Sequence, residues 1–290
     1  MVKIAASLVF AAALAFAQPA PKYPVKYGSN PAAGKTFTHD GVKLYYETYG
    51  SGEPLLIVHG NAGSIADVAA QIDYFRKRYR VIAIDSRDHG KSSDSPDKIT
   101  YEKMAGDLNA LLDHLKTGPV YVLGWSDGGI EALLLGIHHP EKVKKLVSMA
   151  ANLNPSDKAL HPEAVAFIKA AVASAPAVAA NITPAAKREL KVTQMMLEEP
   201  NIDPKELGKI TAPALILASD HDVIADEQEG AQHLANLGLA QVGGGGLHIG
   251  EHGAREVEVL VLLRVVANLQ PMPRLDLAGV RRVDARQNPE

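Results

Sequence analysis

A short stretch, residues 120–129 (VYVLGWSDGG), limits what this chain folds into more than any other part of it. An apolar run rich in β-branched residues ends at Ser126, with Gly124 two residues before it and Gly128 two residues after it. A helical spacing of apolar residues then begins. This G-x-S-x-G pattern predicts a sharp turn from strand to helix that exposes the serine oxygen, because glycines have no Cβ to crowd the turn. Ser126 is therefore the candidate nucleophile, and the backbone N–H of Asp127 is expected to point at a substrate carbonyl oxygen.

A serine hydroxyl needs a histidine base within hydrogen-bond reach, and the histidine needs an acid that orients it. In the architecture that this turn predicts, the order along the chain is serine, acid, histidine. Asp220 and Asp222 both follow a predicted strand, and His248 lies after them in a glycine-rich stretch. Asp157 is a third candidate acid. His252 is the rival base, although it lies at the start of the expected last helix.

Strand patterns alternate with helical patterns through the first half of the chain. Two short alternating runs at its start are joined by Asp40-Gly41, which signals a tight hairpin. The later runs are continuously apolar, as in strands covered on both faces. We therefore expect an α/β fold, with a mostly parallel sheet, helices on both faces and an antiparallel hairpin at the start. The expected strands are residues 35–39, 43–48, 55–58, 81–85, 120–124, 143–149 and 214–218, and the expected helices are residues 64–78, 101–116 and 128–139.

The alternation stops between residues 152 and 210, where alanine-rich helical patterns are separated by prolines. A crossover between parallel strands needs only about a dozen residues. We therefore expect an inserted helical cap over the strand ends, where open α/β sheets bind ligands, with a long ordinary crossover as the alternative. The expected parts are an α/β core at residues 35–152 and 206–268, a cap at residues 153–205 with helices near 162–175 and 183–198, and a last core helix at residues 257–269.

The two ends of the chain differ in composition from this core. Lys3 precedes an apolar run too short to span a bilayer, and the run ends in Ala15-Phe16-Ala17, a small-x-small cleavage pattern. Residues 1–17 are therefore expected to be a secretory signal peptide cleaved after Ala17, which predicts a secreted or periplasmic protein without a membrane anchor. An uncleaved anchor is the alternative. Residues 18–34 contain four prolines and are expected to form a linker, and residues 269–290 a disordered tail.

The bulk composition excludes several classes of function. A length of 290 residues and a formal charge of −3 fit one globular domain. Acidic and basic residues are interspersed, so nucleic acid is not an expected partner. The chain has no cysteine, which rules out disulfides, thiol catalysis and cysteine–zinc sites.

One metal-binding pattern is present. Residues 248–252 fit H-x-x-E-H, which some zinc proteases carry on a helix. Here Gly250 interrupts the pattern and four glycines precede it, so a stable helix under both histidines is not expected. We expect neither a metal nor a cofactor.

Two further motifs accompany the serine turn. The chain carries His59-Gly60-Asn61, the run DSRDHGKS at residues 85–92, and GWSDGG at residues 124–129. Together these motifs resemble the α/β-hydrolases, and in particular the branch of valacyclovir hydrolase-like enzymes, over about residues 35–268. The resemblance implies the fold expected above and a serine hydrolase activity.

The resemblance also implies roles for single residues. It places the triad acid at Asp222, and an oxyanion hole at the backbone N–H groups of Asn61 and Asp127, with His59 bracing the loop. The side chain of Asp127 has two interpretations: an acid favoured by the helix dipole, or, by the resemblance, a group that holds a substrate ammonium. Trp125, beside the nucleophile, is a further candidate for substrate contact.

The leading hypothesis is a secreted serine hydrolase that cleaves esters, lactones or amides of small molecules with Ser126, His248 and Asp222. Alternatives that share the triad are an aminopeptidase-like enzyme and a C–C-bond hydrolase. A ligand-binding protein of the same fold is the alternative outside enzymes, and it is disfavoured because the triad residues are all present. Haloalkane cleavage is disfavoured because that chemistry uses an aspartate where Ser126 stands.

Overall fold

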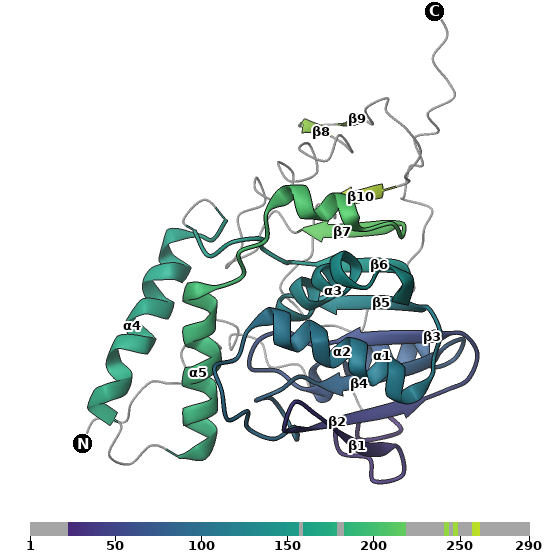
Figure 1. Ribbon diagram of the computed structural model, residues 1–290, viewed down its shortest axis with the longest axis horizontal. Helices are drawn as coiled ribbons and strands as arrows, with labels where there is room; N and C mark the ends of the chain where they lie inside the picture. The colour runs from purple at the N-terminus through teal and green to yellow at the C-terminus, as the bar shows by residue number, and fades with distance from the viewer. Residues whose placement is uncertain are drawn as a thin grey trace, which may run out of the picture.

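A computed structural model of the chain describes residues 23–156, 159–178, 183–218, 241–243, 246–248 and 257–261 (Figure 1). The expected signal peptide and the expected C-terminal tail lie outside these residues, so cleavage after Ala17 stays a prediction.

The described core is one eight-stranded sheet. β1 pairs with β2, and β2 with β4, in the antiparallel direction, and all the other pairs are parallel. The sheet is therefore mostly parallel, as the sequence predicts. The order across it is β1 (Gly34–His39), β2 (Val42–Tyr49), β4 (Arg80–Asp85), β3 (Pro54–Val58), β5 (Val120–Trp125), β6 (Val143–Met149), β7 (Ala214–Ala218) and β10 (Val257–Val261).

The predicted hairpin joins β1 to β2. Its two central residues both have positive φ, 51° at Asp40 and 73° at Gly41. Such a turn matches the right-handed twist of the strands that it connects. An Asp-Gly pair suits it, because glycine adopts positive φ freely and aspartate adopts it more readily than most residues.

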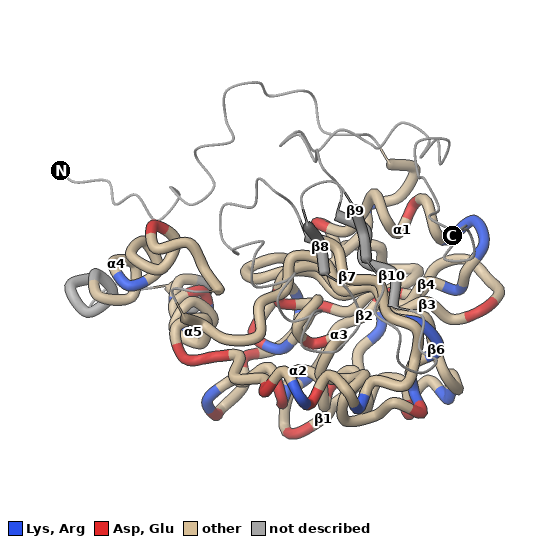
Figure 2. The backbone as a smooth tube through the Cα atoms, turned by 90° about the horizontal axis from the view of Figure 1, so that it is seen from above, with Lys and Arg blue, Asp and Glu red and all other residues tan. Residues whose placement is uncertain are grey.

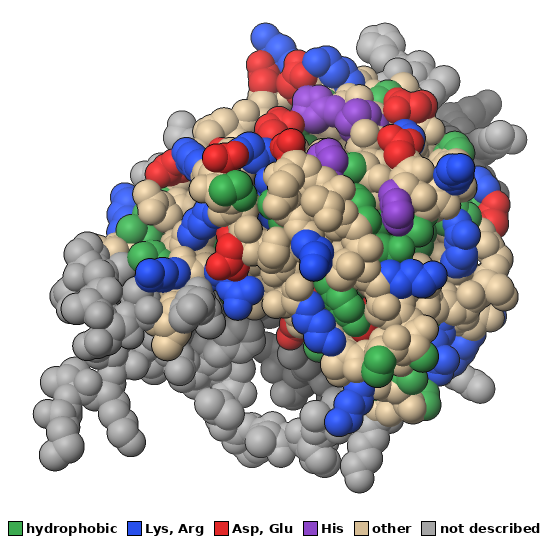
Figure 3. Space-filling model, turned by 60° about the horizontal axis from the view of Figure 1, so that its bottom comes forward, with side chains coloured by type: hydrophobic (Ala, Val, Ile, Leu, Met, Phe, Trp, Pro, Cys, Tyr) green, Lys and Arg blue, Asp and Glu red, His purple; other side chains and the backbone are tan. Residues whose placement is uncertain are grey.

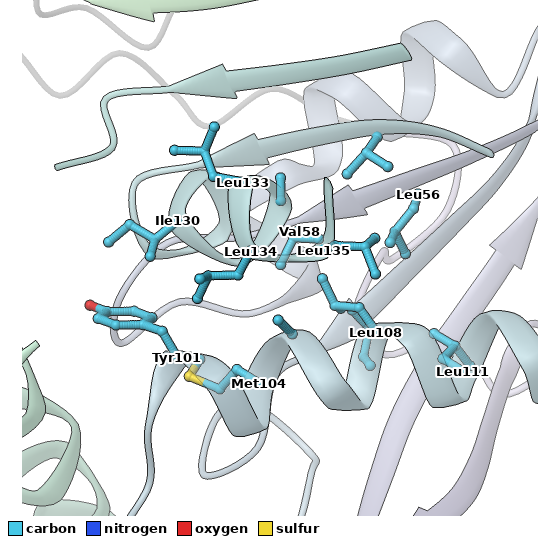
Figure 4. Close-up of a cluster of buried hydrophobic side chains, with 14 of the residues drawn as sticks. Leu56, Val58, Tyr101, Met104, Leu108, Leu111, Ile130, Leu133, Leu134 and Leu135 are labelled. Carbon is cyan, nitrogen blue, oxygen red and sulfur yellow. The ribbon is translucent and has the colours of Figure 1, made fainter. Parts of the chain in front are cut away.

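Helices cover both faces of the sheet. Successive side chains of β3 belong to two different apolar clusters, one for each face of the sheet. Leu56 and Val58 lie in the cluster with α2 and α3, and Leu55 and Ile57 lie in the cluster with α1. Figure 4 shows Leu56 and Val58 among the side chains of α2 and α3. The helices are α1 (Ala69–Phe75), which follows the 3-10 helix Ile65–Val68, α2 (Tyr101–Leu115), α3 (Asp127–His138), and the 3-10 helices Pro140–Lys142 and Pro204–Lys209.

Two helices occupy the expected insertion between β6 and β7. α4 (Pro162–Val178) and α5 (Pro184–Glu198) pack side by side at one edge of the molecule (Figure 1). Val192 and Met195 of α5 are buried and extend the core cluster of α2 and α3. The predicted fold class, an α/β core with an inserted helical cap, is confirmed. None of the described helices combines the length and apolar character that a membrane span requires.

The prediction of a last helix from residue 257 is wrong for Val257–Val261. These residues form β10, which pairs in parallel with β7 from Val257 opposite Ala214 to Val261 opposite Ala218. The run VEVLV is short and rich in valine, and periodicity alone does not distinguish a short buried strand from a buried helix. In the sequence between β7 and β10, two further strands, β8 (Gln241–Gly243) and β9 (Gly246–His248), pair with each other in a second small sheet.

The expectation of a linker at residues 18–34 also needs correction where the structure describes that segment. Tyr27 is only 4% exposed, and its hydroxyl donates to Asp73 at 2.8 Å. The fully buried carboxylate of Glu47 accepts the backbone N–H groups of Gly28, at 2.7 Å, and Asn30, at 3.0 Å. A buried carboxylate needs donors, and this segment supplies them. Residues 23–33 therefore pack against the core through Tyr27, Ala33 and the two donors to Glu47.

Charged residues are dispersed over the described surface. Along the backbone, acidic and basic positions alternate around the rim of the molecule (Figure 2). On the face shown in Figure 3, acidic side chains lie mainly in the upper half, beside basic ones and histidines, and basic side chains predominate in the lower half. This agrees with a formal charge of −3 spread along the sequence.

Candidate active site

Ser126 stands at a sharp turn between β5 and α3. Its backbone has φ 54° and ψ −120°, a conformation that costs a non-glycine residue about 1–3 kcal/mol. Its N–H donates to the carbonyl of Met149 at 2.7 Å, and its own carbonyl accepts the N–H of Gly129 at 2.7 Å. The turn is thus held from β6 on one side and from α3 on the other, and it leaves the serine at the carboxyl end of β5.

The three glycines around Ser126 are required by close backbone contacts. A Cβ on Gly124 would lie 1.9 Å from the carbonyl oxygen of Gly128, and a Cβ on Gly128 would lie 2.5 Å from that of Val58. A Cβ on Gly60 would come within 3.1 Å of the Cβ of Ser126. Side chains at these positions would force the first turn of α3 away from β3 and β5. The spacing of the motif therefore has a steric cause.

Two backbone N–H groups are candidates for an oxyanion hole. Asp127 is the first residue of α3, so its N–H has no acceptor within the helix. Asn61 follows β3, which lies parallel to β5 with Val58 opposite Gly124. The carboxyl ends of β3 and β5 therefore meet, and the loop of Asn61 lies against the serine turn.

His59 braces the loop that carries Asn61. Its Nδ1 lies 2.8 Å from the carbonyl oxygen of Gly60, and its Nε2 accepts the N–H of Ser86 at 3.1 Å. A carbonyl only accepts, so the proton lies on Nδ1 and the ring is neutral. Burial and the neighbouring His89 lower the pKa of His59 to about 3. The expected contact between His59 and this loop is present.

The run at residues 85–92 is buried apart from Gly90 and Lys91, and it follows the carboxyl end of β4. The Asp85 carboxyl accepts the N–H of Ile65 at 2.7 Å and that of Lys91 at 2.8 Å. The Arg87 guanidinium makes two bonds of 2.7 Å to Asp107 on α2. These contacts fix the loop after β4 to α2 and to the segment after β3.

The carboxyl of Asp127 is buried within the protein. Asp127 is 3% exposed. Its Oδ2 accepts from Nδ2 of Asn61 at 2.9 Å, and the hydroxyl of Tyr101 also donates to the carboxyl. Burial raises the pKa of Asp127, and the bonds from Asn61 and Tyr101 and the neighbouring His89 oppose that shift.

Sequence reasoning missed two residues of this region. Glu131, one turn further along α3, is fully buried and accepts from the Ser86 hydroxyl at 3.0 Å; burial raises its pKa well above the usual range. An acid within the apolar run of α3 was the available signal. Tyr101 gave no signal, because only the packing of α2 against α3 brings its hydroxyl to Asp127.

Trp125 is the exposed apolar side chain beside the serine. It ends β5 with 37% of its surface exposed. Its Cε3 would lie 3.5 Å from a Cβ on Gly60, so the ring lies against the loop that carries Asn61. This position suits contact with the part of a substrate that extends from the reacting carbonyl.

The structure brings together Ser126, Asp127, Asn61 and Trp125. The candidate acids Asp222, Asp220 and Asp157 and the rival base His252 lie outside the described residues. His248 ends β9, where its backbone pairs with Gln241, and its side chain is not described. The triad of Ser126, His248 and Asp222 therefore stays a prediction.

A metal site has no support in the described part of the chain, where no three His, Cys, Asp or Glu side chains gather as ligands. Most of the H-x-x-E-H pattern at residues 248–252 lies outside that part.

Comparison with known proteins gives a family match over the middle of the chain. Residues 53–181 match the family described as alpha/beta hydrolase fold. The serine hydrolase BPHL of Mus musculus is 37% identical over 120 residues, which are 39% of this chain and 41% of that protein. 3-Oxoadipate enol-lactonase 2 of Acinetobacter baylyi is 35% identical over 114 residues, 39% of this chain and 43% of that protein. The matched stretches thus span less than half the length of these relatives.

Solved structures resemble more of the chain at lower identity. The enol-lactonase from Burkholderia xenovorans superposes with a TM-score of 0.56 at 21% identity, covering 70% of this chain and 87% of that one. Est816, titled an N-acyl homoserine lactone degrading enzyme, superposes with a TM-score of 0.59 at 23% identity, covering 78% of this chain and 92% of that one. At this identity the likeness shows the fold alone.

Proposed function

From the α/β-hydrolase fold of this chain and its family match over residues 53–181, we propose that the protein is a serine hydrolase of small-molecule esters, lactones or amides. The observation that carries the proposal is the geometry of Ser126. It stands on a positive-φ turn at the end of β5, beside the two backbone segments that supply N–H groups to an oxyanion. A purely structural serine does not require a strained backbone conformation at this place.

The proposed reaction is acyl transfer to the enzyme and then to water. Ser126 Oγ attacks the substrate carbonyl while His248 takes its proton and Asp222 orients the imidazole. The N–H groups of Asn61 and Asp127 stabilise the negative oxygen that forms; each such donor contributes about 3 kcal/mol in enzymes of this kind. The histidine then returns the proton to the leaving group, and water releases the acyl group by the same steps.

The relatives guide the choice of substrate class. A lactonase and a serine hydrolase are among the curated relatives, and solved structures of similar fold include a lactone-degrading enzyme. Lactones and esters present the same carbonyl to a serine. A panel of p-nitrophenyl esters, lactones and aminoacyl esters of matched size is the experiment that separates these classes.

The nucleophile is tested by Ser126→Ala. We expect this variant to lose ester hydrolysis and labelling by a fluorophosphonate probe, because both reactions need the hydroxyl. The circular dichroism spectrum should match that of the unmodified protein, since serine and alanine differ by one oxygen. Labelling retained in the variant would show that another residue reacts.

The triad acid is tested by a pair of variants at neighbouring positions. Asp222→Asn should lower kcat by about 10³- to 10⁴-fold, as in serine proteases whose triad aspartate is replaced, because the histidine loses its orienting acceptor. Asp220→Asn is the matched control and should change kcat by less than about 10-fold, since Asp220 has no triad role in this proposal. The reverse result would assign the acid to Asp220.

A further inference from the structure

The side chain of Asp127 joins the two backbone segments that would form the oxyanion hole. Asn61 Nδ2 donates to Asp127 Oδ2 at 2.9 Å, across 66 residues of sequence. The same two residues carry the proposed backbone donors, one on the loop after β3 and one at the start of α3. A bond between their side chains therefore fixes the distance between these donors.

The fit of the loop against the serine is close enough for this bond to matter. Gly60 precedes Asn61, and a Cβ on Gly60 would lie 3.1 Å from the Cβ of Ser126. His59 fixes the loop on the β3 side through Gly60 and Ser86. Asn61 itself is half-buried, and its bond to Asp127 is the side-chain contact that ties it to α3.

Tyr101 is a second donor to the Asp127 carboxyl. It is the first residue of α2, it is 2% exposed, and its hydroxyl donates to the Asp127 carboxyl. Figure 4 shows its ring at one end of the apolar cluster with the hydroxyl oxygen at the outer edge. The N–H of Tyr101 donates to Oε2 of Glu199, just after α5, at 3.0 Å. The end of the cap is thus bonded to the residue that orients Asp127.

The surroundings of Asp127 disfavour a substrate cation at this carboxyl. An ammonium would have to enter a site that is 3% exposed and compete there with Asn61 and Tyr101, which both already donate to the carboxyl. Displacing Asn61 would also disturb the loop donor that the reaction needs.

We propose that the Asp127 carboxyl is a positioning group: itself bonded to Tyr101, it holds Asn61 so that the loop N–H stays in the oxyanion hole. The assignment rests on the proposed serine hydrolase function. Small displacements of a catalytic donor are costly, because its position must hold to about 0.5 Å.

The experiment compares Asp127→Ala and Asp127→Asn on a plain ester and an aminoacyl ester of matched size. Asp127→Ala should lower kcat on both esters by about 10-fold or more, with KM changed less than about 3-fold, because the donor acts on the transition state. Asp127→Asn should recover most of that loss, since its amide oxygen still accepts from Nδ2 of Asn61. Tyr101→Phe should lower kcat by a smaller factor.

Glu102→Gln is the matched control, because Glu102 is an exposed acid in the first turn of α2 and contacts none of these groups. It should leave kcat and KM unchanged. If Asp127→Ala does not fold, Asn61→Ala removes the same bond by changing its half-buried partner, and it should show the same loss of kcat.

Two outcomes would overturn the assignment. Unchanged kcat on the plain ester in both Asp127→Ala and Asn61→Ala would show that the bond positions nothing. An aminoacyl preference in the unmodified protein that Asp127→Asn abolishes, with plain-ester rates retained, would assign Asp127 to an ammonium. A protein that neither hydrolyses the esters nor reacts with the fluorophosphonate at Ser126 would instead refute the proposed function, and this assignment with it.

Discussion

The serine turn and the helical cap attach to the sheet in different ways. At the turn, backbone lies on backbone: Gly128 packs so closely on the end of β3 that its Cβ would lie 2.5 Å from the Val58 carbonyl oxygen. The cap attaches through the buried side chains Val192 and Met195 and also through long polar side chains. Lys191 of α5 reaches Asp88 at 3.0 Å, and Arg188 reaches Asp94 at 3.3 Å.

The difference separates what must be rigid from what is adjustable. Backbone groups in direct contact have no rotamers to change, so the position of the nucleophile follows from the sheet itself. Lysine and arginine side chains have several rotatable bonds and accommodate small shifts of the helix that carries them. We therefore expect substitutions at the turn to be far more costly than substitutions of the polar side chains that join the cap to the core.

The largest effect is expected from Gly124→Ala. The new Cβ would lie 1.9 Å from the Gly128 carbonyl oxygen, which is backbone and cannot rotate away. We expect a loss of more than about 4 kcal/mol in the free energy of unfolding, or no folded protein. Gly106→Ala in α2 is the control, since a Cβ there meets nothing within 4 Å, and it should be neutral or stabilising by up to about 1 kcal/mol. Chemical denaturation of both variants measures the contrast, and equal stabilities would contradict the steric account.

The next effect concerns the loop beside the turn and depends on pH. The pKa of His59 is lowered to about 3 in the folded protein, from 6.5 when exposed. Between these values the unfolded chain binds the extra proton, so the stability from a neutral His59 is complete above about pH 6.5 and is lost as the pH falls.

The measurement is the difference in stability between the unmodified protein and His59→Gln at several pH values. Between pH 7 and pH 4, His59 should lower the free energy of unfolding by about 3 kcal/mol, and the variant should not show this loss. Urea denaturation between pH 4 and 7 gives the slope of the free energy of unfolding against pH for both proteins. Parallel slopes would mean that His59 accepts a proton without cost in the folded state.

The smallest effects are expected at the cap, where two basic residues of α5, each paired with a different aspartate, can be compared. Lys191 donates to Asp88 and to the Ser95 hydroxyl and carbonyl oxygens, and Lys191→Met should cost about 1–2 kcal/mol. Arg188 pairs with the exposed Asp94, and Arg188→Met should cost less than about 0.5 kcal/mol. Thermal unfolding compares the two. A Lys191 variant as damaging as Gly124→Ala would remove the distinction between the regions.

Local patterns in the sequence predicted the parts of the fold that are determined locally. The serine turn follows from glycines within two residues of Ser126, and the first hairpin follows from Asp40-Gly41. Neither depends on distant residues. Buried strands such as β3 and β7 were also recognised, because short continuous apolar runs are typical of a parallel sheet.

Features that depend on distant contacts were not predictable in the same way. The strand Val257–Val261 is short, and only its pairing with β7 distinguishes it from a helix. The burial of Asp127 comes from Asn61 and Tyr101, which are remote in sequence. Both interpretations of its carboxyl fitted the sequence, and these two contacts disfavour the one in which it binds a substrate ammonium.

The carboxylate of Glu47 has a practical consequence for anyone who shortens this protein. It is fully buried and has four donors: the hydroxyls of Tyr45 and Tyr49, and the backbone N–H groups of Gly28 and Asn30. A recombinant version trimmed to the first strand would retain the two phenols and lose both amides, leaving a charge in the interior with half its partners. Affinity tags and protease sites therefore belong upstream of Tyr23, although a boundary drawn from sequence composition alone would place them next to β1.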